Sequence, residues 1–221
     1  MMKIHRTNFL VAAALVALLG SAASAGTIQA VPAPTSSGPG LGFASVPVVV
    51  TVQQNNDNVP APQFLDNNIT VALKRFEAAN YIDIVFNVLQ SDGTTEYQVS
   101  EFVDNGTTIP WSSYRMELGF GTGTSFAINP NADDLDFDFP NYDLPPTSAA
   151  FPIVSTPNPD TLVFSGGLHG TDAQPYAFRI DVPDGIQTFT LRQIPTLVPE
   201  PSAIMLVGFV LAGFAANRRR G

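Results

Sequence analysis

The densest group of chemically active side chains is an acidic run over residues 129–139, Asn-Pro-Asn-Ala-Asp-Asp-Leu-Asp-Phe-Asp-Phe. If this run is extended, Asp134, Asp136 and Asp138 lie on one side and the apolar residues between them on the other. Carboxylates two residues apart on a strand stand about 7 Å apart. They share one Ca²⁺ ion at about 2.4 Å only if the chain curls. The run therefore predicts either a Ca²⁺ site or, the favoured interpretation, an edge strand with a charged solvent face.

Groups suited to acid–base or nucleophilic catalysis are few. The chain has two histidines and no cysteine, which excludes cysteine-based zinc sites and thiol catalysis. His169 lies in a glycine-rich segment, residues 165–172, where Ser, His and Asp are too close in sequence to converge easily into a triad. No G-x-S-x-G motif is present. We therefore expect no enzyme activity and predict that His169 is a solvated loop residue.

Charge is distributed unevenly along the chain. The formal net charge is −9, yet half of the ten basic residues lie at the two ends. The stretch from Gly26 to Val198 contains five basic and eighteen acidic residues. It has no basic stripe that could neutralise phosphates, so nucleic acid is not an expected partner. The 19 prolines and 17 glycines favour short strands joined by many turns.

The N-terminus has the organisation of a secretory signal peptide over residues 1–25. Lys3, His5 and Arg6 precede an apolar run at 9–19, and Ala23-Ser24-Ala25 forms an A-x-A cleavage site. The apolar run is shorter than the roughly 20 residues that span a bilayer. We therefore predict cleavage after Ala25, with Gly26 as the first residue of the mature chain.

The C-terminus has three parts in a fixed order. Pro199, Glu200 and Pro201 come first, a helix is predicted over about 202–216, and Arg218, Arg219 and Arg220 follow. The helix is short for a permanent span, so it must be transient or thin the bilayer. The three arginines are predicted to act as a stop-transfer signal that stays cytoplasmic.

This tail, residues 198–221, resembles the PEP-CTERM sorting signal of Gram-negative bacteria. Pro199, Glu200 and Pro201 match its motif, the apolar segment matches its helix, and the three arginines match its basic cluster. The resemblance implies recognition by an exosortase, a membrane transpeptidase that cuts near the motif. It also implies a transient stay in the inner membrane and then a place at the cell surface or in the exopolysaccharide or biofilm matrix. A simple C-terminal membrane anchor is the alternative.

The region between the two ends has the pattern of an all-β domain, residues 41–197, preceded by a flexible linker at 26–40. Apolar residues alternate with polar ones at 82–88, 114–120 and 176–182, as in half-buried strands. In the third of these segments, Arg179 and Asp181 are expected to face solvent. Residues 46–52 form another candidate strand, and 69–76 is favoured as a strand over a helix.

Three glycine-containing turns separate the candidate strands: Ser91-Asp92-Gly93, Asp104-Asn105-Gly106 and Pro183-Asp184-Gly185. Because Asp-Gly and Asn-Gly tolerate the positive φ of tight hairpins, each turn is predicted to join two paired strands. The proline-rich segment 141–160 is predicted to be a long loop. Together these features predict a single antiparallel β-sandwich or jelly roll.

The sequence therefore predicts a non-catalytic β-sandwich that is exported, sorted and associated with surface polysaccharide. The alternative is a carbohydrate-binding module of the same fold, with or without Ca²⁺ dependence. That alternative requires exposed aromatic side chains, and the candidates are Trp111, Tyr114, Tyr142 and Tyr176. Trp111 by itself is predicted to fill the core or plug a strand end.

Overall fold

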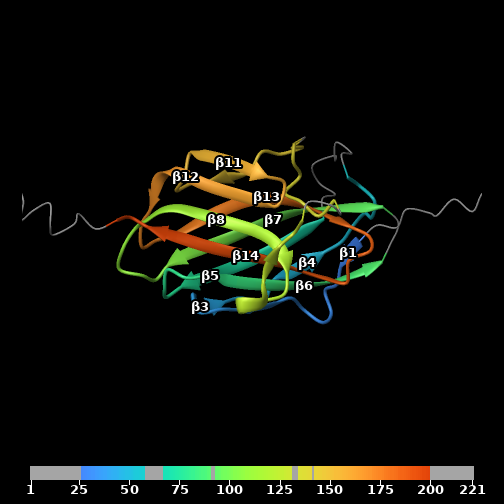
Figure 1. Cartoon of the computed structure of the whole chain (residues 1–221), viewed down its shortest axis with the longest axis horizontal. Helices are drawn as coiled ribbons and strands as arrows, with labels where there is room; N and C mark the ends of the chain where they lie inside the picture. Colours follow the sequence, from blue (N-terminus) through green and yellow to red (C-terminus); the bar gives the residue numbers. More distant parts are fainter. Residues whose placement is uncertain (1–25, 58–66, 91–92, 131–133, 141, 200–221) are drawn as a thin grey trace, which may run out of the picture.

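A computed structural model describes residues 26–57, 67–90, 93–130, 134–140 and 142–199. These residues form two β-sheets that enclose one hydrophobic core (Figure 1). The first sheet contains, in spatial order, β1 (Gly26–Ile28), β6 (Ile82–Gln90), β14 (Thr188–Leu197), β8 (Trp111–Phe120), β12 (Thr161–His169) and β11 (Ile153–Asn158), with β2 (Thr35–Ser37) on β6 and β9 (Ala127–Ile128) on β8. The second contains β10 (Thr147–Ser148), β13 (Ala173–Pro183), β7 (Thr94–Asn105), β5 (Asn68–Phe76) and β3 (Leu41–Ala44), with β4 (Val48–Val50) on β5.

The all-β class is confirmed, and a 3₁₀ turn, η1 (Gly123–Ser125), is the only helical element among the described residues. The segment at 69–76 is strand β5, as favoured. The expectation of purely antiparallel pairing is wrong, because β5 and β7 pair in parallel. Within the described residues, no helix is long and apolar enough to cross a membrane. The predicted signal peptide and the helix at 202–216 lie outside the described residues.

The core is built by the inward faces of the strands whose period-two pattern the sequence displays. In β6, Ile82, Ile84 and Phe86 are fully buried. The two sheets meet through aromatic rings: Phe76 of β5 packs edge-on against Trp111 of β8, with ring centroids 5.2 Å apart. Each such side chain contributes about 1.5–3 kcal/mol by leaving water. This burial fixes which face of every strand points inward.

Of the three predicted turns, the one at Pro183-Asp184-Gly185 is present, Asp104 and Asn105 instead belong to β7, and Ser91 and Asp92 lie outside the described residues. None of the three segments joins two paired strands. β6 and β7, β7 and β8, and β13 and β14 are each consecutive in sequence, yet the members of each pair lie in different sheets. Gly93 and Gly185 have φ values of 88° and 92°, which is the conformation expected of glycine in a tight turn. Local turn chemistry therefore sets where the chain reverses. It does not set whether the next strand pairs with the previous one or crosses the core.

Two segments predicted to be irregular are strands at sheet edges. The expected linker at 26–40 contains β1 and β2, both of which pair with β6. Gly26 packs so closely that a Cβ there would stand 2.2 Å from the carbonyl oxygen of Pro183. The expected loop at 141–160 contains β10 and β11, paired with β13 and β12. Both predictions are wrong for these short strands, because proline and glycine are tolerated in edge strands, where one side of the backbone needs no partner. Most of the other described residues in the two ranges are irregular, as predicted.

Candidate functional site

An acidic pocket lies where the segment 134–140 runs alongside the edge of β13 and pairs with it at Asp181. Asp136 and Asp181 exchange two backbone hydrogen bonds in an isolated antiparallel bridge, with N···O distances of 3.3 and 3.0 Å. The pocket has a volume of about 260 Å³. Its lining combines five aspartates with three other residues: Asp57, Asp134, Asp136, Asp138, Asp181, Thr94, Phe139 and Pro140.

The segment that carries the predicted aspartates curls instead of running straight. Asp134 and Asp138 adopt left-handed backbone conformations, with φ of 58° and 52°. Leu135 and Phe137 point into the core and are fully buried, as the alternating pattern predicts. The interpretation as a solvent-facing edge strand is therefore wrong. The curl that a shared site would require is present, because two buried apolar anchors hold the segment against the sheet.

All three predicted aspartates line this one pocket, and Asp57 and Asp181 join them from distant parts of the chain. Asp181 was expected to face solvent, so the sequence contained no signal that could have found it. It lies directly opposite Glu96 of β7 in the sheet register, a placement of like charges that destabilises a strand pair. Among the described residues, no three His, Asp or Glu side chains converge closely enough to form a ready-made metal site.

The electrostatics of the pocket favour protons or a cation. Burial, which is the largest effect, raises the pKa of Asp136 to about 6, and that of Asp138 to about 7. Burial and then the neighbouring carboxylates raise the pKa of Asp181 to about 9. The Asp181 side chain is 7% exposed, and its Oδ1 atom is buried with no hydrogen-bond partner. A buried carboxylate oxygen without a donor is costly, so a proton or a cation bound at this atom would be stabilising.

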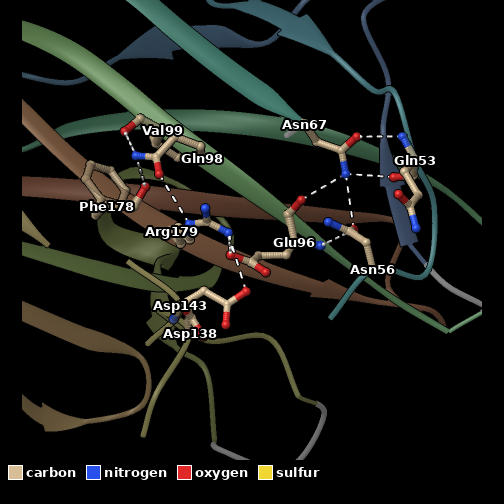
Figure 2. Close-up of polar contacts among 10 residues, drawn as sticks. All are labelled: Gln53, Asn56, Asn67, Glu96, Gln98, Val99, Asp138, Asp143, Phe178 and Arg179. Atoms are coloured by element: carbon tan, nitrogen blue, oxygen red, sulfur yellow. Dashed lines mark hydrogen bonds and ion pairs between the residues drawn. The ribbon is translucent and has the colours of Figure 1, made fainter. Parts of the chain in front are cut away.

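One arginine supplies positive charge beside the pocket (Figure 2). Arg179 of β13 is buried and forms an ion pair with Glu96, and its Nη1 lies 3.8 Å from Asp143 Oδ2. Its Nε donates to Gln98 Oε1 at 3.3 Å. The backbone N–H of Asp143 donates to Asp138 Oδ2 at 3.0 Å, which ties this network to the pocket wall. The expectation that Arg179 and Asp181 face solvent is wrong, because residues of the segment 134–140 line the pocket with Asp181 and Asp143 lies beside Arg179.

A second set of polar contacts holds the irregular segment 51–57, which follows β4 and ends at Asp57. The Asn67 side-chain oxygen accepts the N–H groups of Val52 and Gln53, at 2.7 and 3.0 Å. Its Nδ2 donates to the Gln53 carbonyl at 2.7 Å and to the Glu96 carbonyl at 2.9 Å (Figure 2). Asn67 thereby fastens the 51–57 segment to β7, at the start of which Glu96 lies. This arrangement positions the Asp57 side of the pocket relative to the Asp181 side.

The aromatic residues proposed for glycan binding are mostly internal. Trp111, Tyr114 and Tyr176 are buried, which confirms the prediction that Trp111 is a core residue. Tyr142 is half-buried, and its hydroxyl forms a hydrogen bond with the Thr156 hydroxyl. The prediction of a solvated His169 is wrong, because this residue is 0% exposed. Its Nδ1 lies 2.8 Å from the Tyr176 hydroxyl and its Nε2 lies 3.0 Å from the Asp172 carbonyl. Burial lowers the pKa of His169, which favours the neutral ring.

A comparison with known protein families found a match for the C-terminal end of the chain. Residues 197–220 match the family model of the PEP-CTERM protein-sorting motif. This match includes the predicted Pro199, Glu200 and Pro201 and the arginine cluster. No curated protein and no solved structure was found to match the chain. The match begins at the last residue of β14, where the described fold ends.

Proposed function

We propose that this chain, which bears a PEP-CTERM sorting motif and is exported as an exosortase substrate, is a structural protein of the cell surface or extracellular matrix. Its β-sandwich ectodomain has a non-catalytic role, in association with exopolysaccharide or biofilm matrix. The observation that carries this proposal is where the motif starts. It begins at Leu197, directly at the end of β14, with no spacer between fold and motif.

The position of β14 supports a role in attachment. This strand pairs with β6 on one side and β8 on the other, so it lies in the middle of its sheet (Figure 1). Beyond its end, the N–H of Val198 still donates to the Pro110 carbonyl at 3.0 Å. A pull on the C-terminus is therefore resisted by two ladders of hydrogen bonds. An edge strand would offer only one.

The enclosed aromatic and histidine side chains support a structural ectodomain over a lectin or an enzyme. Glycan platforms need aromatic rings at the surface, and three of the four candidates are buried. His169 lies in the core and is engaged on both ring nitrogens.

The sorting proposal is tested by replacing Pro199, Glu200 and Pro201 with alanine. The expected result is a longer, unprocessed form that stays in the inner-membrane fraction. Cell fractionation followed by immunoblotting measures both properties. Ser202→Ala, next to the motif but outside its three key residues, is the matched control and should be processed as in the wild type. Normal processing and release of the triple variant would refute sorting through this motif.

A second function is favoured by the unpaired Asp181 oxygen. We propose that the acidic pocket binds Ca²⁺ with Asp136, Asp138 and Asp181 as ligands and with Asp57 and Asp134 at its rim. Oxygen-only donor sets suit this ion, and extracellular modules bind it with dissociation constants of about 10⁻⁴–10⁻³ M. A bound divalent cation would offset the repulsion among the carboxylates and link the 134–140 segment to β13.

Calorimetric titration and thermal melting in Ca²⁺, Mg²⁺ or chelator test this second proposal. Ca²⁺ at a hundred times its dissociation constant should stabilise the protein by about 2.7 kcal/mol. Asp181→Asn should abolish binding, whereas Asp172→Asn, at an exposed aspartate outside the pocket, should leave it intact. The proposal fails if millimolar Ca²⁺ produces neither heat nor a shift in melting temperature in the wild type.

A further inference from the structure

A second buried polar cluster lies inside the core, between the two sheets. It consists of Lys74 of β5, Glu101 of β7 and Gln193 of β14, which are 0%, 2% and 0% exposed. The first two belong to one sheet and the third to the other. A lysine in such a place must have partners for its ammonium group, because an isolated buried charge is prohibitively costly. Neither the sorting motif nor the acidic pocket uses any of these three residues.

The three side chains form a closed triangle of an amine, a carboxylate and a carboxamide. Lys74 Nζ lies 2.6 Å from Glu101 Oε2 and also contacts Gln193 Oε1. Gln193 Nε2 donates to both carboxylate oxygens of Glu101, at 2.9 and 3.1 Å. The amine thus lies against the carboxamide carbonyl, while one carboxylate contacts both the amine and the amide nitrogen. This arrangement places a nucleophile, an electrophile and a proton carrier in mutual contact.

The surroundings activate the amine. The rings of Phe76 and Tyr114 enclose Lys74 Nζ, with centroids 6.0 and 5.9 Å away. Burial lowers the pKa of Lys74, and the nearby Glu101 carboxylate opposes this effect only in part. A lysine desolvated in this way gives up its proton more readily and becomes a nucleophile. Glu101 is the adjacent base that can take the proton.

We infer that Lys74 and Gln193 join through an intramolecular isopeptide bond, formed without any other protein and with Glu101 as the proton carrier. Glu101 accepts a proton from the Lys74 ammonium, and the neutral Nζ attacks the Cδ carbon of Gln193. The Nζ–Cδ bond forms, the Cδ–Nε2 bond breaks, and Glu101 delivers protons from Nζ to the departing nitrogen. One ammonium ion leaves and the Glu101 carboxylate is restored, so charge and atoms balance with no oxidant or co-reactant.

The bond would join strands that are remote in sequence and belong to different sheets. Lys74 and Gln193 are 119 residues apart, and Gln193 lies on the last strand before the sorting motif. The cross-link would therefore fasten the C-terminal strand covalently to β5. A surface protein held by its C-terminus would then resist being pulled open at β14. This consequence depends on the proposed attachment, whereas the bond itself does not.

The experiment is mass spectrometry of the protein purified from its own cells and digested after denaturation. The expected product is a branched peptide that joins Lys74 to Gln193 and weighs one ammonia less than its two linear parts. Total mass alone is insufficient, because the Asn105-Gly106 pair can also lose ammonia by forming a succinimide. Localisation of the bond by fragmentation distinguishes the two. If the folded wild-type protein yields only linear peptides containing Lys74 and Gln193, the inference is overturned.

Substitutions distinguish formation of the covalent bond from a purely non-covalent contact between the three side chains. Glu101→Gln keeps the size and hydrogen bonding of the side chain but removes the proton carrier, so the branched peptide should disappear while circular dichroism stays β-like. Lys74→Met should also abolish it. Gln187→Glu, at an exposed glutamine just before β14, is the control and should retain the bond. A branched peptide in Glu101→Gln at the wild-type level would exclude Glu101 as the proton carrier. Should that variant fail to fold, the wild-type digest still decides the inference.

Discussion

The two buried polar clusters of this domain lie on opposite faces of the same sheet. On the inner face, Lys74 and Glu101 of this sheet and Gln193 of the facing sheet form a network in which opposite charges and amide groups satisfy one another. On the outer face, Asp136, Asp138 and Asp181 gather charges of one sign and leave one buried oxygen unpaired. A balanced network needs nothing from outside the protein. A one-signed cluster is incomplete without protons or a cation, which makes the outer face the place for a ligand and the inner face the place for internal chemistry.

The largest expected effect comes from unbalancing the inner cluster. Lys74→Met removes the buried Nζ donor of Glu101, which is the ammonium before the cross-link forms and the amide N–H afterwards. The carboxylate then stays buried without this partner, which should lower the free energy of unfolding by about 3–5 kcal/mol. Denaturant titration measures this loss. The neighbouring Arg75→Met, which removes a half-exposed arginine, is the control and should change stability by less than about 0.5 kcal/mol. A similar effect of the two substitutions would contradict the balanced-network interpretation.

Removing the cation beside the outer cluster should have the next largest effect. Arg179→Met deprives Glu96 of its buried partner and adds one uncompensated negative charge next to the pocket. The expected loss is about 3 kcal/mol, at the lower end for a buried pair. In contrast to Lys74→Met, saturating Ca²⁺ should restore part of this stability. Equal losses with Ca²⁺ and with chelator would remove the link between Arg179 and the pocket.

A substitution that removes an acidic group from the outer cluster should not lower the free energy of unfolding, in contrast to the two substitutions above. Asp181→Asn removes an acidic group that faces Glu96 and whose pKa of about 9 keeps it protonated at neutral pH. In chelator the substitution should therefore leave stability unchanged at pH 7 and raise it by up to about 1 kcal/mol above pH 9, where the carboxylate is ionised. Thermal melting with and without chelator provides the measurement. A marked loss of stability in chelator would mean that the Asp181 carboxylate already has a partner within the protein.

A third buried group, His169, should make the stability of the protein depend on pH. Its contribution to the free energy of unfolding should be the smallest of those considered. Its Tyr176 and Asp172 contacts hold a neutral ring, and burial lowers its pKa in spite of the nearby Asp104 and Asp172 carboxylates. The unfolded chain therefore binds the proton more tightly. The stability contributed by His169 is present above its ordinary pKa of about 6.5 and is lost as the pH falls through that value.

The His169 effect is measured as a difference between variants, because Asp136 and Asp138 titrate in the same range. Unfolding free energies of the wild type and His169→Gln are compared at pH 7.5 and 5.5. The wild type should lose stability more steeply toward acid, by at most about 1.4 kcal/mol per pH unit for one proton. Parallel pH profiles would contradict a buried neutral ring.

Features encoded by neighbouring residues were predictable from the sequence. The alternation at 82–88 determines which face of β6 is buried, because side chains on a strand alternate every second residue. Gly93 and Gly185 adopt the positive φ that their sequence context predicts, and Gly185 lies in a turn. The sorting motif is a contiguous stretch at the end of the chain, so no fold is needed to recognise it. The acidic run also predicted three residues of the pocket, since its buried apolar residues and its aspartates alternate within seven positions.

Only the tertiary structure decided which segments meet. The turns at Gly93 and Gly185 have hairpin chemistry, yet each sends the chain to the other sheet, because strand pairing depends on the whole core and not on the turn. Arg179 and Asp181 have the pattern of a solvent face but are covered by a loop some forty residues earlier in the chain. The contact between Lys74 and Gln193 joins positions 119 residues apart. The sequence by itself determined local conformation and the sorting address. Burial, charge pairing and reactivity depend on long-range contacts, which no local pattern encodes.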